Sequence, residues 1–141
     1  MRKRTKAREC ALQILYQIDI TSDKPASAMV SYWHDNPQPQ DITEFATRLV
    51  EGTLASQKDI DVLLAKYAEN WTIPRMAVVD RNILRMATYE LLHSPDVPPK
   101  VSINEAVDLA KKFGDAESGK FVNGILDRIL KESKTNDSKK G

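Results

Sequence analysis

The sequence predicts an all-α protein of about seven helices without a β-sheet. Apolar residues recur at three- and four-residue spacing in nearly every segment, whereas the strict alternation typical of strands is absent. Prolines, glycines and capping residues divide the chain into pieces of helical length. With 141 residues, of which 41% are hydrophobic and 29% charged, the chain suits one globular domain with a single core.

The first part of the chain predicts three helices. The first has an apolar stripe at helical spacing, made of Ala7, Cys10, Ala11, Ile14, Leu15 and Ile18. A shorter second helix after Pro25 carries Ala26, Met29, Val30 and Trp33. Residues 36–40 contain two prolines and predict a loop. Asp41 and Glu44 then form a capping pair, so we expect the third helix to begin there.

Four more helices are predicted after the third. The fourth carries Ile60, Leu63, Leu64 and Tyr67, and a turn at residues 72–74 follows it. The fifth is long and apolar on more than one side, which is typical of a helix at the centre of the packing. Its apolar positions include Met76, Val79, Ile83, Met86, Ala87, Leu91 and Leu92.

The last two helices are predicted from their ends. The capping pair Ser102 and Glu105 is expected to open the sixth helix, and Gly114 to end it. Asp115 and Ser118 can then open the seventh, which buries Val122, Ile125, Leu126, Ile129 and Leu130. Because the chain has no apolar residue from residue 131 onward, we assign one helical domain to residues 1–134 and a disordered tail to residues 135–141.

The net charge of +1 hides a concentrated basic arm. Residues 1–8 contain five basic side chains and no acidic one, namely Arg2, Lys3, Arg4, Lys6 and Arg8. The remaining residues therefore sum to −4, because +1 minus +5 is −4. Such an arm favours a polyanionic partner at one end of the molecule, although a merely solvated arm fits the charges equally well.

The sequence offers no catalytic or metal-binding pattern. His34 and His93 lie apart from each other and from Cys10, and no paired-cysteine spacing, HExxH or phosphate-binding glycine loop is present. We therefore expect a protein that is not an enzyme and needs no cofactor or metal. A single cysteine, the lack of a long apolar run and the lack of a secretory signal favour the cytoplasm.

Two groups of residues suit RNA. Arg4 and Arg8 share a helix face if the first helix reaches back that far, and Tyr16 follows two turns later. Arginine matches phosphate and an aromatic ring stacks on an unpaired base. The alternative for Tyr16 is a half-buried core position. The second group is Lys120, Phe121 and Asn123, with a cation, a ring and an amide, and its alternative is that Phe121 is core.

Long ordered segments of the chain resemble the NusB family of bacterial transcription antitermination factors. They are residues 6–17 (KARECALQILYQ), 80–92 (DRNILRMATYELL) and 97–124 (VPPKVSINEAVDLAKKFGDAESGKFVNG). The resemblance implies two packed helical subdomains, one of three helices and one of four. It also implies binding of single-stranded boxA RNA of ribosomal RNA leader transcripts through the arginine-rich entry, Tyr16 and the KFVN segment.

The resemblance extends to Glu117 and to protein partners. Glu117 matches a position near the RNA at which a substitution increases RNA affinity in the family. NusE, a basic small-subunit ribosomal protein, is implied to dock near Met76 and Asp80, and the heterodimer joins elongating RNA polymerase with other Nus factors. From the residues alone, Asp80 and Glu90, with Met76 and Val79, could form an exposed, partly acidic surface. The alternative is that Asp80 pairs with Arg81, Arg85 or a neighbouring helix.

Two other functions remain open from the sequence. The same helical domain occurs in front of ribosomal RNA cytosine methyltransferases, but this chain ends at Gly141 without a methyl-donor-binding domain. A protein-interaction module or homodimer with a solvated arm is the second alternative. Thr5 within the basic run and Gly119 before Lys120 depart from the common family pattern.

Overall fold

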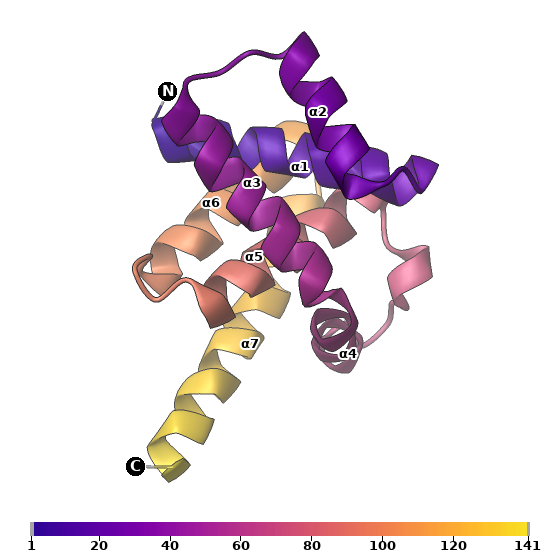
Figure 1. Cartoon of the computed structure of the whole chain (residues 1–141). Helices are drawn as coiled ribbons and strands as arrows, with labels where there is room; N and C mark the ends of the chain where they lie inside the picture. Colours follow the sequence, from indigo (N-terminus) through magenta and orange to yellow (C-terminus); the bar gives the residue numbers. More distant parts are fainter. Residues whose placement is uncertain (1, 141) are drawn as a thin grey trace. The chain divides into compact units, whose positions relative to one another are not determined.

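The computed structural model describes residues 2–140, with side chains described through residue 133 (Figure 1). Within this range the chain forms seven α-helices, one 3-10 turn and no strand. The elements are α1 (Lys3–Thr21), α2 (Pro25–Asp35), α3 (Gln40–Ala55), α4 (Gln57–Tyr67), η1 (Ile73–Arg75), α5 (Val78–His93), α6 (Pro99–Phe113) and α7 (Ser118–Lys140).

The helices divide between two compact units. The first unit, Met1–Ala55, contains α1 to α3, and the second, Ser56–Gly141, contains α4 to α7. The all-α class and the division into three and four helices are therefore confirmed. The assignment of residues 1–134 to one domain stays a prediction. The expected disordered tail, residues 135–141, lies outside the residues whose side chains are described.

The first unit is built on the contact between α1 and α3, and α2 contacts both. The α1 residues at this contact include Ala7, Ala11 and Ile14, all fully buried. Small alanines let the helix axes approach closely, and the larger apolar side chains supply most of the stabilisation, about 1.5–3 kcal/mol for each one fully buried. From α3 the buried set is Ile42, Ala46, Leu49, Val50 and Thr53.

The second unit surrounds α5, which contacts α4, α6 and α7. Its burial on several sides confirms the predicted central helix. Polar side chains are buried on it as well, and two of them have clear partners. Arg85 donates to both carboxylate oxygens of Asp61, at 2.8 and 3.0 Å. The hydroxyl of Ser102 donates to Glu90 at 2.6 Å.

Two of the predicted helix starts are wrong. The sixth helix begins at Pro99 rather than Ser102, because proline fits the first helical position, and the buried Ser102 hydroxyl bonds Glu90 instead of capping the backbone. The third helix begins at Gln40, one residue before Asp41, and the Gln40 side-chain amide donates to the Glu44 carboxylate at 2.7 Å.

The predicted start of the seventh helix is confirmed. Asp115 accepts the backbone N–H of Glu117 at 2.8 Å, and the Ser118 hydroxyl accepts the backbone N–H of Asp115 at 3.0 Å. Each side chain thus satisfies a backbone donor that the helix itself leaves unpaired. Gly114 is needed here, because a Cβ at that position would collide with the Ser118 side chain and lie 2.8 Å from the Ala110 carbonyl oxygen.

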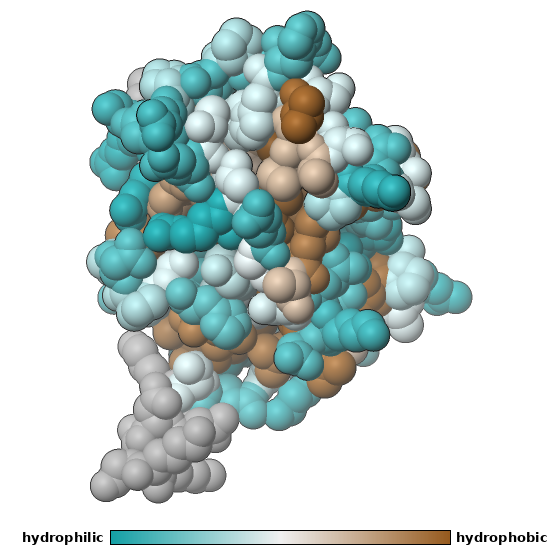
Figure 2. Space-filling view, viewed as in Figure 1, coloured by the Kyte–Doolittle hydropathy of each residue, from teal (hydrophilic) through white to brown (hydrophobic). Residues whose placement is uncertain are grey.

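The surface is mostly hydrophilic on the face shown in Figure 2, with smaller apolar areas between the polar side chains. Large apolar side chains with substantial exposure among the described residues are Tyr16, Ile20, Val30, Val62, Trp71, Leu92, Val101 and Phe113. None of the helices within the described residues combines the length and the apolar content that a membrane crossing requires.

Candidate nucleic-acid interface

In the first unit, three arginines surround one aromatic ring. The guanidinium carbons of Arg4 and Arg8 lie 4.7 and 5.3 Å from the ring centroid of Phe45, and that of Arg48 lies 5.2 Å away. The helix α1 reaches back to Lys3, so Arg4 and Arg8 do share a face, as the spacing predicts. Guanidinium groups pack well on aromatic faces, and the ring holds the arginines in one cluster.

The members of the predicted arm differ in exposure. Arg2 and Arg4 are exposed, Lys6 is half-buried, and Arg8 is only 3% exposed. The arm is helical from Lys3 onward, where the Lys3 ammonium pairs with Asp41 at 2.8 Å. That hydrogen bond raises the pKa of Lys3 and lowers the pKa of Asp41.

Tyr16 lies on the surface of α1. Its exposed fraction is 39%, whereas its neighbours Leu12 and Leu15 are buried. The half-buried core position that the pattern alone allowed is therefore not the one observed. Part of the ring is therefore accessible to a molecule that binds the first unit.

In the second unit, the first turns of α7 present the other predicted RNA residues. Lys120 and Asn123 are exposed, Glu117 is exposed, and Phe121 is half-buried. The Phe121 ring meets Trp71, with the centroids 6.4 Å apart and the planes at 72°. Trp71 is 50% exposed and lies between α4 and η1.

Trp71 was missed by the sequence reasoning. It lies in a short segment without helical periodicity, and its ring contact is with a residue far along the chain. Only its residue type, a large aromatic beside polar loop residues, could have drawn attention to it.

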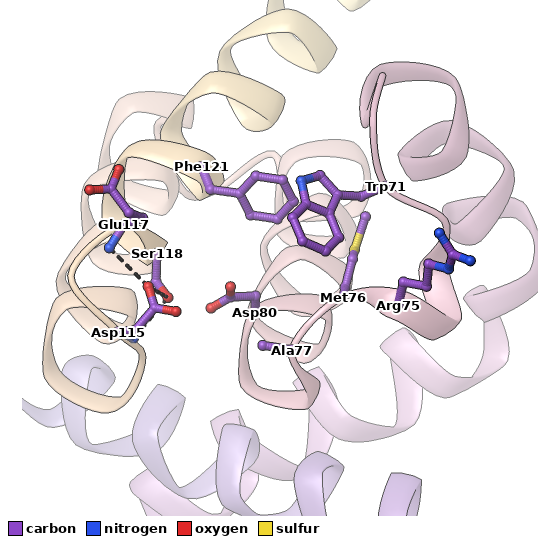
Figure 3. Close-up of a pocket in the computed structure, with 9 residues that line it drawn as sticks. All are labelled: Trp71, Arg75, Met76, Ala77, Asp80, Asp115, Glu117, Ser118 and Phe121. Carbon is purple, nitrogen blue, oxygen red and sulfur yellow. Dashed lines mark hydrogen bonds between the residues drawn. The ribbon is translucent and has the colours of Figure 1, made fainter.

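A cavity of about 380 Å³ opens on one side of this ring pair. Figure 3 shows Phe121 from α7 and Trp71 pointing toward one another, with the Asp80 carboxylate beneath them in that view. The lining residues are Trp71, Arg75, Met76, Ala77, Asp80, Asp115, Glu117, Ser118 and Phe121. Met76 and Asp80, the two residues predicted to contact NusE, therefore line the same cavity as two residues predicted to contact RNA, Glu117 and Phe121.

The expected exposure of Met76, Asp80 and Glu90 is wrong. Asp80 is 7% exposed and Glu90 is buried, because α5 is packed against three other helices. Met76, which follows η1 and precedes α5, is 4% exposed. The Arg85 guanidinium pairs with Asp61 on α4.

Asp80 carries an unusual carboxylate. Its Oδ1 has no hydrogen-bond partner among the described residues. Burial raises the pKa of Asp80 above its ordinary value of 3.8; a hydrogen bond with Ser118 opposes that rise and the nearby Asp115 charge adds to it. An ionised carboxylate here is costly, and a cation or donor brought by a partner would relieve that cost.

A second cavity, of about 240 Å³, is also lined by Trp71 and Phe121. It is lined by Tyr67, Ala68, Glu69, Asn70, Trp71, Lys120, Phe121, Gly124, Ile125 and Arg128. Arg128 donates to the Tyr67 carbonyl oxygen at 2.9 Å and lies 3.6 Å from the Glu69 carboxylate. Three aromatic residues, Tyr67, Trp71 and Phe121, and two cations, Lys120 and Arg128, thus line one hollow, which suits a base and its phosphate.

The NusB family model matches residues 5–131 of this chain. The chain belongs to the NusB family. It is 48% identical over 129 residues to the transcription antitermination protein NusB of Desulfatibacillum aliphaticivorans, and the match covers 92% of this chain and 90% of that protein.

Solved NusB structures are similar throughout. T. maritima NusB is 40% identical, with a TM-score of 0.85, and the match covers 92% of this chain and 91% of that one. A chain in the crystal structure of antitermination factors NusB and NusE in complex with double-stranded RNA is 33% identical, with a TM-score of 0.86 and coverage of 94% and 98%.

As a member of the NusB family, the protein is a transcription antitermination factor and not an enzyme. The family and the fold expected from the sequence are both confirmed. Within the described residues, no three His, Cys, Asp or Glu side chains are grouped where they could hold a metal ion.

Proposed function

We propose that this antitermination factor binds single-stranded boxA RNA in ribosomal RNA leader transcripts. It does so as a heterodimer with NusE, and the heterodimer joins elongating RNA polymerase and the other Nus factors in the cytoplasm. The similar complex that contains NusB, NusE and RNA supports both partners. The proposed binding needs no cofactor, because phosphate neutralisation and base stacking supply the free energy.

One observation carries the RNA part of the proposal: the Trp71 and Phe121 rings meet beside Lys120 and Arg128. Each stacked base contributes about 1–3 kcal/mol to binding of a single strand. The two cations bordering the same hollow attract the phosphates on either side of such a base. Asn123, exposed on the next turn of α7, offers an amide for base edges.

The first unit supports the proposal with its own cationic surface. Arg2 and Arg4 are exposed on α1, Lys6 is half-buried, and Tyr16 offers an accessible ring. Arg8 is buried over Phe45, so its proposed part is to hold Arg4 and the ring in position. In the proposal the same RNA strand contacts this surface and the one around Phe121.

The cavity in Figure 3 supports the NusE part. Asp80, Asp115 and Glu117 give its lining three carboxylates against one cation, Arg75, and Met76 and Trp71 give apolar surface. A basic partner would find an acidic hollow there, and a cation near Asp80 would relieve its unpartnered oxygen. We therefore assign the NusE contact to this cavity.

A gel shift with boxA RNA, with and without NusE, tests the proposal. We expect the protein alone to shift the single strand and NusE to tighten the complex. Gel filtration at several concentrations shows whether the free protein is a monomer or a homodimer. If neither the protein nor its mixture with NusE retards boxA RNA, the proposed function is wrong.

A further inference from the structure

Gly124 occupies a position in α7 that the fold does not explain. It is the seventh residue of the helix Ser118–Lys140, where glycine destabilises by about 0.5–1 kcal/mol relative to alanine. A Cβ built on Gly124 would meet no heavy atom within 4 Å. By contrast, Gly114 has no room for a Cβ and Gly119 has little, because Lys111 Cγ would lie 3.2 Å away. Packing therefore accounts for those two glycines and not for Gly124.

The bare surface at Gly124 forms part of the wall of the 240 Å³ cavity. We call this hollow the Gly124 cavity; its lining residues are given above. The Trp71 and Phe121 rings border it, and Lys120 and Arg128 bring positive charge. Glycine lets another molecule approach a backbone more closely than any other residue does.

We propose that the Gly124 cavity receives one unpaired nucleobase of the bound RNA, lying against the bare surface of α7. This inference rests on the proposed RNA-binding function and deepens it, because it names the site of a single base and a residue that makes room for it. The rings supply stacking, and the Asn70 amide and the exposed backbone supply groups for a base edge.

A base fits this hollow better than a side chain of a protein partner. At about 240 Å³ the cavity is smaller than the 300–1,000 Å³ typical of drug-sized ligand sites, so it suits one planar ring system. Its two cations favour a ligand linked to phosphate over a basic protein. Its carboxylate, on Glu69, lies beside the Arg128 guanidinium at 3.6 Å. The cavity with the carboxylates of Asp80, Asp115 and Glu117 is the better match for a basic protein.

The variant Gly124→Ala tests the inference, because stability and binding should change in opposite directions. An added methyl in open space should raise the Tm by about 2–4 °C through helix propensity. The same methyl should weaken boxA RNA binding by about fivefold or more, the loss expected when one stacked base is displaced. Asn104→Ala is the matched control, since Asn104 is exposed in the middle of α6 and lines neither cavity. It should raise the Tm and leave RNA affinity unchanged.

Abasic substitutions in the RNA identify the base. One abasic position should weaken binding to the wild-type protein more than any other position does. The same abasic RNA should bind Gly124→Ala almost as well as the intact RNA does, because the variant has already displaced that base. Normal wild-type binding together with unchanged affinity of Gly124→Ala would overturn this inference and leave the proposed function intact. A loss of NusE affinity without a loss of RNA affinity would overturn it too. If the wild-type protein binds no boxA RNA, both this inference and the proposed function are wrong.

Discussion

The Trp71 and Phe121 rings meet edge to face, with centroids 6.4 Å apart and planes at 72°. The two residues come from the segment after α4 and from α7, and both line both cavities. The ring pair is therefore shared by a hollow with the carboxylates of Asp80, Asp115 and Glu117 and by one bordered by Lys120 and Arg128. A partner of either charge that docks in this unit has to contact the same pair of rings.

The first prediction concerns the rings of this pair. Phe121→Ala should weaken boxA RNA binding by about 5- to 150-fold, the loss of one stacked base at 1–3 kcal/mol. Phe121→Tyr keeps the ring and should bind within about twofold of wild type. Fluorescence anisotropy at fixed salt measures both. Equal affinity of the Ala and Tyr variants would show that the ring does not stack on RNA.

Tyr16→Ala tests the first unit in the same way. Because Tyr16 is 39% exposed, the substitution should lower the free energy of unfolding by about 1–2 kcal/mol, which leaves the protein folded. RNA affinity should nevertheless fall by about fivefold or more, and Tyr16→Phe should restore it. Thermal melting and anisotropy on the same samples give both quantities. Wild-type affinity in the Ala variant would exclude Tyr16 from the RNA surface.

Glu117→Lys should tighten boxA binding. Glu117 is exposed at the start of α7, one turn before Phe121, where its negative charge repels phosphate. The change should cost about 0.3–1 kcal/mol of stability, because an acidic residue near a helix N-terminus interacts favourably with the helix dipole. Glu117→Gln should give an intermediate affinity. An unchanged or larger dissociation constant for Glu117→Lys at fixed salt would refute the repulsion.

The salt dependence of RNA binding counts the phosphate contacts. If about four phosphates are neutralised, log affinity should fall against log salt with a slope of about −3, using about −0.7 per contact for single strands. Arg4→Gln should make the slope shallower by about 0.7. A complex whose affinity does not depend on salt would exclude the cationic residues as the principal contact.

Asp80→Asn should stabilise the fold at neutral pH. Because the pKa of Asp80 is raised in the folded state, ionisation of its carboxyl destabilises that state; the penalty is absent below the unfolded value and grows as pH rises through the folded pKa. The gain should be up to about 1 kcal/mol at pH 7, where an unpaired buried oxygen is costly, and should vanish as the pH falls to about 3.8 and below. Melting curves of both proteins across this range measure it.

The same variant tests the NusE contact. Asp80→Asn removes the charge and keeps the shape, so it should weaken NusE binding without unfolding the protein. Asp80→Lys is unsuitable, because a buried lysine in that position would destabilise the core. Unchanged NusE affinity of Asp80→Asn would remove Asp80 from the interface.

Local signals in the sequence predicted much of the fold. The start of α7 follows from Asp115 and Ser118 because a capping pair depends only on residues three apart. The capping rule gives the wrong helix start at Ser102. The two prolines before Ser102 begin α6 earlier, and the Ser102 hydroxyl donates to Glu90 on α5. A hydrogen bond between helices cannot be read from local spacing.

The candidate site was predicted less completely, for a similar reason. Phe121 and Lys120 could be named from one segment, but Trp71 and Arg128 join them only through folding. The burial of Asp80 and Arg8 likewise follows from the helices packed around them. Residue types along one helix indicate the chemistry of a surface, and tertiary contacts decide which side chains reach it.

Photo-crosslinking tests the central claim most directly, namely that one RNA strand contacts both units. A boxA RNA with a photoreactive uridine at one position at a time is bound to an equimolar amount of the protein, and crosslinked peptides are mapped by mass spectrometry. We predict crosslinks near Tyr16 from some positions and near Phe121 from others of the same strand. Crosslinks confined to one unit at every position would contradict the claim.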